Sequence, residues 1–160
     1  RDRCGESYAV VQAKVNESIS EGLQVLLCCG ESLEVRESEG HFDLIAEQLK
    51  DALRAIQPEQ MDKIIIAYEP VWAIGTGVTA SAEQAQEMHR FIRDRIQEWY
   101  SADIAKATRI LYGGSCKPSN ADEIFSQPDV NGGLIGGAAL DADSFLALIR
   151  SSETTQSAAK

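Results

Sequence analysis

The sequence predicts an α/β fold in which helices and parallel strands alternate along the chain. Two observations carry this prediction: apolar residues recur at helical spacing in several segments, and between these segments lie short, continuously apolar runs. Continuous apolar runs of strand length are typical of a parallel sheet that is buried on both faces. Two architectures remain open: a small open sheet, or the latter half of an eight-stranded barrel, since 160 residues fall short of the about 250 that a whole barrel needs.

The first three elements are predicted as helix, strand and helix. Apolar residues at steps of three and four indicate a helix over residues 8–19, and Gly22 is a suitable C-terminal stop. The run at residues 24–29 predicts a strand buried on both faces. A second amphipathic helix is expected over residues 42–56, because Pro58 lies just beyond it.

The middle of the chain repeats the pattern. Residues 63–68 predict another buried strand, and residues 85–99 carry a third helical stripe. Ser81 with Gln84 three residues later forms a capping box, in which each side chain satisfies a backbone N–H at the start of the helix.

The last part of the chain predicts two further strands and two helices. The strands are expected over residues 109–112 and 133–135, each followed by paired glycines. The helices are expected over residues 120–125 and 143–150. The tail, residues 151–160, is rich in Ser, Thr and Ala and is expected to be disordered, so residues 1–150 form the predicted domain.

Charge and composition exclude several partners. The chain has 15 Lys and Arg against 25 Asp and Glu, a formal charge of −10, which would repel nucleic acid and an anionic membrane surface. No apolar run approaches the roughly 20 residues of a membrane-spanning helix, and the histidines and cysteines lack metal-binding spacing. The cysteines also lack C-x-x-C spacing, which favours a reducing, cytoplasmic compartment. Because the chain opens on Arg1 without a leader pattern, we expect a fragment or processed product.

A carboxylate is expected at the end of the second strand. Pro70 disfavours helical geometry in the preceding residue, so Glu69 should stay extended and project from the carboxyl end of the strand, where active sites of α/β proteins lie. The alternative is a solvated glutamate at a strand end.

Three glycine-bearing loops follow the predicted strands, around Gly75, Gly113 and Gly136. Residues 75–80 fit G-x-G-x-x-A, but they do not follow a strand directly, as a dinucleotide-binding turn should. A mobile lid with an exposed Trp72 fits this loop better. Together the loops predict a phosphate cradle built from backbone N–H groups, the alternative being ordinary tight turns.

The segment from Tyr68 to Gly77 resembles the signature of the triosephosphate isomerase family. The resemblance continues, in family order and spacing, through Cys28–Glu31, Ala85–His89, Ile110–Ser115 and Leu134–Ala138. It implies a TIM (β/α)8 barrel of which this chain supplies about the last four strands and their helices.

The resemblance also implies an activity and a set of site residues. The expected reaction interconverts dihydroxyacetone phosphate and glyceraldehyde 3-phosphate, without a cofactor, with Glu69 as the catalytic base. The residues expected to bind the substrate phosphate are Gly75, Ser115, Gly136 and Gly137. The residues expected to form the lid and its contacts are Pro70, Val71, Trp72, Ala73, Ile74, Thr76, Gly77, Tyr112 and Glu31.

Other implications concern the rest of the family's site. The family's catalytic lysine, with its neighbouring asparagine, and its histidine have no counterpart here, so the isolated chain should be inactive. A non-catalytic phosphate-binding barrel fragment is the alternative. Arg93 and Asp129 resemble a structural ion pair, and His89 is interpreted as structural. Val78 and Cys4 depart from the family pattern, and Cys4 bears on the homodimer expected of a full-length member.

Overall fold

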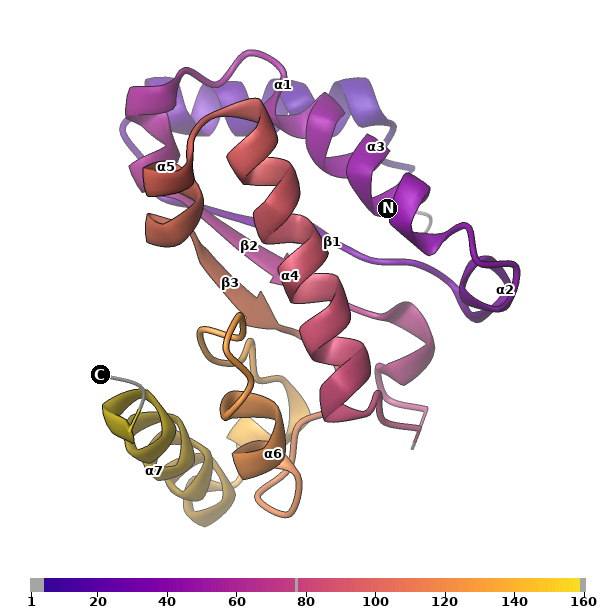
Figure 1. Cartoon of the computed structure of the whole chain (residues 1–160), viewed down its shortest axis with the longest axis vertical. Coiled ribbons are helices and arrows are strands. Elements are labelled where there is room, and N and C mark those ends of the chain that lie inside the picture. The colour runs from indigo at the N-terminus through magenta and orange to yellow at the C-terminus, as the bar shows by residue number, and fades with distance from the viewer. Residues whose placement is uncertain (1–4, 77, 159–160) are drawn as a thin grey trace.

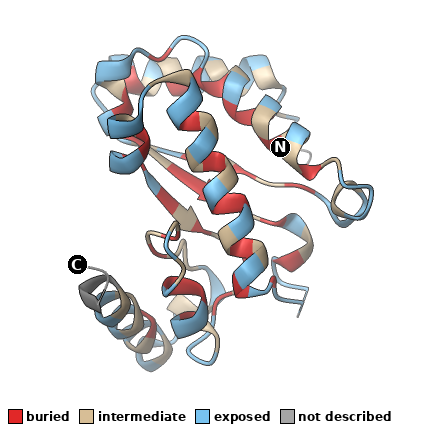
Figure 2. Cartoon of the chain, viewed as in Figure 1, coloured by how far each residue is buried: buried red, intermediate tan, exposed pale blue. Residues whose placement is uncertain are grey.

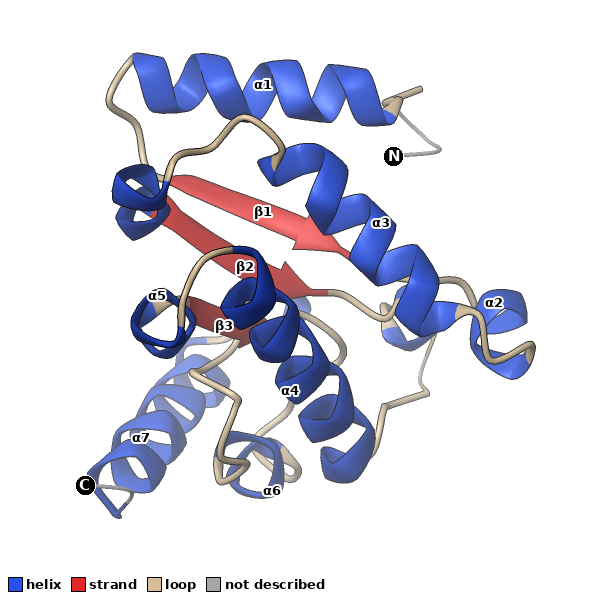
Figure 3. Cartoon of the chain, turned by 45° about the horizontal axis from the view of Figure 1, so that its top comes forward, coloured by secondary structure: helices blue, strands red, loops and turns tan. Residues whose placement is uncertain are grey.

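Three parallel strands form the sheet of this computed structural model, which describes residues 5–76 and 78–158 (Figure 1). They are β1 (Val25–Cys29), β2 (Ile64–Tyr68) and β3 (Arg109–Tyr112), and they lie in that order across the sheet (Figure 3). Cys29 pairs with Tyr68, and Tyr68 pairs with Tyr112. The carboxyl ends of the strands are therefore level, and the segments that follow them meet at one edge.

Helices account for most of the remaining chain. The α-helices are α1 (Tyr8–Ser20), α2 (Leu33–Glu37), α3 (His41–Leu53), α4 (Ala82–Trp99), α5 (Ala102–Ala107), α6 (Ala121–Phe125) and α7 (Ala142–Ala158). The 3₁₀ turns are η2 (Pro58–Lys63), η3 (Val71–Ala73) and η4 (Gly137–Leu140). Among these described residues, no helix has the length and apolar character needed to cross a membrane. The short helices α2 and α5 were not predicted, whereas the equally short α6 was.

The ends of the long helices confirm the capping signals in the sequence. Gly22 has φ +79°, and the N–H of Leu23 donates to the carbonyl of Ser18 at 2.9 Å, which is the hydrogen bond of a Schellman stop. At the start of α4, Ser81 and Gln84 form the expected capping box. The predicted helix over residues 85–99 therefore begins three residues earlier than its apolar stripe.

The sheet is fully covered on one face only, contrary to the prediction for the first strand. Leu27, Ile66 and Ile110 share a face through the strand register and are buried in one cluster with side chains of α1, α3 and α4. On the opposite face Leu26 is 41% exposed. Figure 2 shows the buried residues gathered along the strands and on the helix sides that face them. An apolar run alone cannot show whether both faces of its strand find a covering layer.

The strand predicted over residues 133–135 is not formed, which corrects the sequence prediction. Only the pair of Tyr112 with Gly133 makes a parallel bridge. Leu134 does donate its N–H to the carbonyl of Tyr112 at 2.9 Å, but Gly132 has φ +135°, outside the conformation of a strand. The segment therefore follows the edge of β3 without becoming a regular strand.

The C-terminal region also differs from its prediction. Helix α7 continues to Ala158, whereas residues after Arg150 were expected to be disordered. Thr154 and Thr155 donate their hydroxyl protons to carbonyls one turn earlier, at 2.9 and 3.0 Å, and Ser151 donates to Asp122 of α6. The contact with α6 helps to hold a polar segment whose composition does not predict a helix. The predictions about Cys4 and Gly77 lie outside the described residues.

Candidate functional site

Glu69 lies at the carboxyl edge of the sheet, between the segments that follow β1 and β3. Its N–H donates to the carbonyl of Cys29 at 2.7 Å, and the N–H of Gly113 donates to the carbonyl of Tyr68 at 2.7 Å. The strand pairing thus continues one residue past the ends of the strands. Glu69 itself is half-buried, so its backbone is fixed while part of the residue remains accessible.

Two glycines leave the space that Glu69 occupies. A Cβ on Gly30 would lie 1.8 Å from the carbonyl oxygen of Glu69, and a Cβ on Gly113 would lie 2.6 Å from its Cγ. Neither position could carry a larger residue without moving Glu69. Sequence reasoning found Gly113 as a loop glycine but missed this second role, because the two glycines meet Glu69 only in the folded sheet.

A cavity of about 620 Å³ gathers the residues predicted to bind phosphate. Glu69, Gly75 and Ser115 line it together with Gly136 and Gly137. A Cβ placed on any of these three glycines would meet no other atom within 4 Å. There is therefore unoccupied space beside each of these glycines, where a side chain would otherwise lie.

A second cavity, of about 560 Å³, lies on the other side of Glu69. Its lining includes Gly30, Gln48 and Glu69. Gln48 is a residue that the sequence analysis missed: it lies on the apolar stripe of α3 and is only 7% exposed. A polar residue at a buried helical position was the signal that could have found it.

The loop after β2 is tied to the loop after β3. The hydroxyl of Ser115 donates to the carbonyl of Ala73 at 2.7 Å, and the N–H of Ser115 donates to the same oxygen at 2.9 Å. Thr76 donates its hydroxyl proton to the carbonyl of Trp72 at 2.8 Å. The segment predicted to form a lid therefore lies against Ser115 in this structure.

Tyr112 lies beneath these loops. Its hydroxyl would be only 2.2 Å from a Cβ on Gly114, so this glycine provides the room for the ring. Burial raises the pKa of Tyr112 to about 12, and the phenol is neutral at physiological pH.

Glu31 is the most buried carboxylate among the described residues, with 1% exposure. The hydroxyl of Tyr68 and the indole N–H of Trp72 both donate to its Oε1, each at 2.9 Å. Arg36 adds a longer ion pair at 3.9 Å. The expected contact between Trp72 and Glu31 is therefore present, and Trp72 is half-buried rather than exposed. Burial and the nearby Glu31 carboxylate raise the pKa of Tyr68.

Arg93 and Asp129 form the expected ion pair behind the site. The Nε of Arg93 donates to Oδ1 of Asp129 at 2.7 Å. The two Nη atoms donate to the carbonyls of Ala105, Thr108 and Asp129 and to the amide oxygen of Asn131. All five donors of the guanidinium are thus used, and they connect α4, α5 and the segment after α6.

His89 is fully buried next to this network. Its ring lies 6.0 Å from that of Tyr68, edge-on, and 6.4 Å from that of Tyr112, while Nδ1 lies 3.3 Å from the carbonyl oxygen of Asp129. Burial lowers the pKa of His89 to about 4. The neutral ring packs beneath the two tyrosines that precede Glu69 and Gly113.

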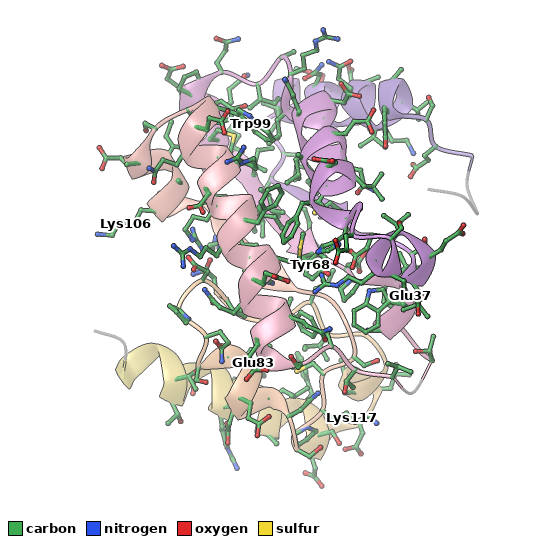
Figure 4. The ribbon with its side chains drawn as sticks, turned by 45° about the vertical axis from the view of Figure 1, so that its right-hand side comes forward. Glu37, Tyr68, Glu83, Trp99, Lys106 and Lys117 are labelled. Carbon is green, nitrogen blue, oxygen red and sulfur yellow. The ribbon has the colours of Figure 1, made fainter. Side chains whose placement is uncertain are left out.

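Among the described residues, one cation lines the cavity that contains Gly75 and Gly136. Lys117 lies at its rim, with its side chain in no ion pair among the described residues. Figure 4 labels it near the lower edge of the molecule, whereas Tyr68 lies among packed side chains near the centre. Asn120 accepts the N–H of Lys117 at 2.7 Å and donates to the carbonyl of Ser115 at 3.3 Å, so the loop that carries Lys117 is fixed.

Parallel strands, helices packed against one face and a glycine-lined cavity at the carboxyl ends define an α/β protein. The chain belongs to the triosephosphate isomerase family, whose model matches residues 1–152. Triosephosphate isomerase from Flavobacterium johnsoniae is 55% identical over 144 residues, which cover 90% of this chain and 58% of that protein. The enzyme of the same name from Chlorobium phaeobacteroides is 49% identical over 146 residues, covering 91% of this chain and 58% of that protein. The chain thus spans well under two thirds of the length of these relatives.

Proposed function

We propose that this chain is the C-terminal part of a (β/α)8 barrel that interconverts dihydroxyacetone phosphate and glyceraldehyde 3-phosphate. One observation carries the proposal: a single cavity brings Glu69 together with Gly75, Ser115, Gly136 and Gly137, which come from three separate loops. These are the residues to which the family resemblance assigns the base and the phosphate contacts.

The sheet supports the barrel part of the proposal. One face of β1 carries the half-exposed Leu26, and β1 pairs only with β2 among the described residues. In a closed barrel this face of β1 would point into the packed interior. The edge of β1 that faces away from β2 would pair with a neighbouring strand. In this proposal residues 1–150 belong to the barrel, in a cytoplasmic enzyme that forms a homodimer.

The chemistry would proceed through proton transfer at two adjacent carbons. The carboxylate of Glu69 removes a proton from the carbon next to the substrate carbonyl and returns it to the former carbonyl carbon, while the hydroxyl proton passes from the oxygen of the first carbon to that of the second. One carbon is oxidised as the other is reduced, so no external oxidant, reductant or cofactor is required. Backbone N–H groups at the glycine loops hold the phosphate, and this remote binding energy favours closure of residues 70–77 over the reacting carbons. Closure excludes water and strengthens the electrostatic interactions inside the site.

The proposal requires groups from the rest of the barrel. The family's lysine, asparagine and histidine would lie in the part that this chain does not match, so the 160-residue chain alone should not isomerise substrate. We define the completed barrel as this chain joined to the portion of the Flavobacterium johnsoniae relative that it does not cover.

Glu69→Gln in the completed barrel tests the proposal. The amide preserves the shape of the side chain but removes the basic lone pair, and general-base contributions are typically about 10²–10⁴-fold. We expect kcat to fall by at least about 10³-fold, while affinity for a phosphate-bearing mimic of the intermediate stays unchanged. Glu59→Gln, on exposed η2, is the matched control and should leave both quantities unchanged.

Two results would count against the proposed function. If the Glu69→Gln variant kept kcat within about threefold of the parent, a barrier change under about 1 kcal/mol, Glu69 would not be the base. If the completed barrel bound the mimic but showed no isomerisation, the non-catalytic phosphate-binding fragment would be the better description.

A further inference from the structure

We propose that Gln48 is a positioning residue for Glu69: its side-chain amide holds Gly30 against the backbone of Glu69 and thereby sets where the carboxylate lies. The inference rests on the proposed function only in treating Glu69 as the base. It concerns a residue of α3, on the opposite side of Glu69 from the phosphate loops.

Gln48 makes two hydrogen bonds to one residue. Its Oε1 accepts the N–H of Gly30 at 3.0 Å, and its Nε2 donates to the carbonyl of Gly30 at 2.9 Å. A neighbouring strand would offer the same pair of groups to an edge backbone. The side chain of α3 therefore takes the place of a strand at the position just past β1.

Gln48 is a polar residue on a buried, apolar face of α3. Its neighbours on the helix, Ile45 and Leu49, are completely buried, and Gln48 is 7% exposed. A buried amide is unfavourable unless its donors and acceptor are satisfied. Leucine or methionine would fill the same volume without that requirement, so what the amide adds here is the hold on Gly30.

Gly30 transmits this hold to Glu69 by direct contact. The Cα of Gly30 lies so close to Glu69 that a Cβ would stand 1.8 Å from the carbonyl oxygen and 2.7 Å from the carbonyl carbon of Glu69. On the other side, Gly113 packs against the Cγ of Glu69. Glu69 thus has backbone on both sides, and a shift of Gly30 must move it.

The effect should be visible in turnover rather than in substrate affinity. Gln48 lines the cavity on the β1 side of Glu69, with Cys28 and Cys29, and does not line the cavity that holds Gly75, Ser115 and Gly136. Displacing a catalytic group by about 1 Å can reduce the rate about 100-fold. A smaller displacement should therefore reduce kcat and leave the phosphate contacts intact.

The test compares Gln48→Leu and Gln48→Glu in the completed barrel with the control Gln97→Leu on the exposed face of α4. We expect Gln48→Leu to lower kcat about tenfold with KM within about twofold of the parent. Amide hydrogen exchange should accelerate at Gly30 and Glu69 in this variant, because the N–H of Gly30 loses its acceptor. Gln97→Leu should change neither the kinetics nor the exchange at these two positions.

Gln48→Glu adds a readout that a purely structural role would not produce. A protonated carboxyl can accept from the N–H of Gly30 and donate to its carbonyl, as the amide does, whereas the carboxylate can only accept. Burial favours the protonated form. The ratio of kcat for Gln48→Glu to kcat for the parent should therefore be near one at about pH 5 and fall as the pH rises towards about 9.

Four outcomes distinguish the possibilities. Unchanged kcat with unchanged exchange at Gly30 and Glu69 in a folded Gln48→Leu variant would overturn the inference, as would a kcat ratio for Gln48→Glu that does not depend on pH. If Gln48→Leu does not fold, the Gln48→Glu series still decides. If the parent shows no isomerisation, the proposed function fails, and the exchange at Gly30 and Glu69 continues to test the position of Gln48.

Discussion

The region behind the sheet and the cavity at its carboxyl edge are built in opposite ways. Behind the sheet, Arg93 uses all five of its donors on groups that include Asp129 and Asn131. Side-chain hydrogen bonds therefore hold the elements of this region together. In the cavity, unoccupied space lies beside Gly75, Gly136 and Gly137, where side chains would otherwise project. Stability should therefore respond to removing side chains behind the sheet, whereas activity should respond to adding them at the edge.

The largest expected effect is on stability, from Arg93→Ala in the completed barrel. Removing the guanidinium leaves the carboxylate of Asp129, whose side chain is 19% exposed, without its cation. Breaking a fully buried pair in this way typically costs about 3–5 kcal/mol, and because this pair is partly exposed we expect a loss near the lower end of that range. Denaturant unfolding should show a loss of this size. Arg90→Ala, at a side chain that is 74% exposed, should change stability by less than about 0.5 kcal/mol.

If Arg93→Ala left the free energy of unfolding unchanged but abolished kcat, Arg93 would belong to the chemistry and the comparison between the two regions would break.

Acid should destabilise the region behind the sheet through His89. Its pKa is lowered to about 4 by burial, below the value of about 6.5 in an unfolded chain, so the unfolded state binds a proton that the folded state does not. The contribution of the neutral ring is complete above about pH 6.5 and is lost as the pH falls towards 4, on the order of 3 kcal/mol in total.

His89→Gln keeps a donor for the carbonyl of Asp129 but does not titrate. The slope of unfolding free energy against pH between about 6.5 and 4 should become shallower by about one proton in this variant. His41→Gln is the control, because His41 is the other buried histidine. Burial and the nearby Arg36 also lower the pKa of His41. An unchanged slope in His89→Gln would show that His89 does not contribute to acid unfolding.

The glycines of the cavity allow a sharper comparison. Gly113→Ala would place a Cβ 2.6 Å from the Cγ of Glu69 and should lower kcat about 100-fold by displacing the carboxylate. Gly136→Ala would place a Cβ in open space, where we expect the phosphate, and should raise KM about tenfold with little change in melting temperature. Steady-state kinetics separates the two. Equal effects of both variants on KM and kcat would contradict the division of the cavity into a base side and a phosphate side.

The smallest expected effect concerns Lys117 at the rim. In a chain of net charge −10, a cation at the cavity mouth should attract a dianionic substrate, and salt should screen this attraction. Lys117→Gln is expected to lower kcat/KM about two- to fivefold at low ionic strength and to have no effect at about 1 M salt. Lys106→Gln, on the exposed surface of α5, should show no such dependence.

Much of this organisation is visible in the sequence because it depends on a few neighbouring residues. The order of helices and strands follows from the spacing of apolar side chains, the stop at Gly22 from its freedom to adopt φ +79°, and the start of α4 from the reciprocal bonds of Ser81 and Gln84. The position of Glu69 at a strand end follows from the proline after it. Each of these features depends on contacts within about one turn of helix or one strand.

The tertiary structure decided what surrounds those features. Gly30 and Gly113 enclose Glu69 only because three strands end level with one another. Gln48 reaches Gly30 across 18 positions of sequence, and Ser115 reaches Ala73 across 42. The exposed side of β1 and the contact of α7 with α6 were likewise decided by which elements lie nearby in the folded chain. No local pattern records such contacts, because burial and close approach depend on segments that meet only when the chain has folded.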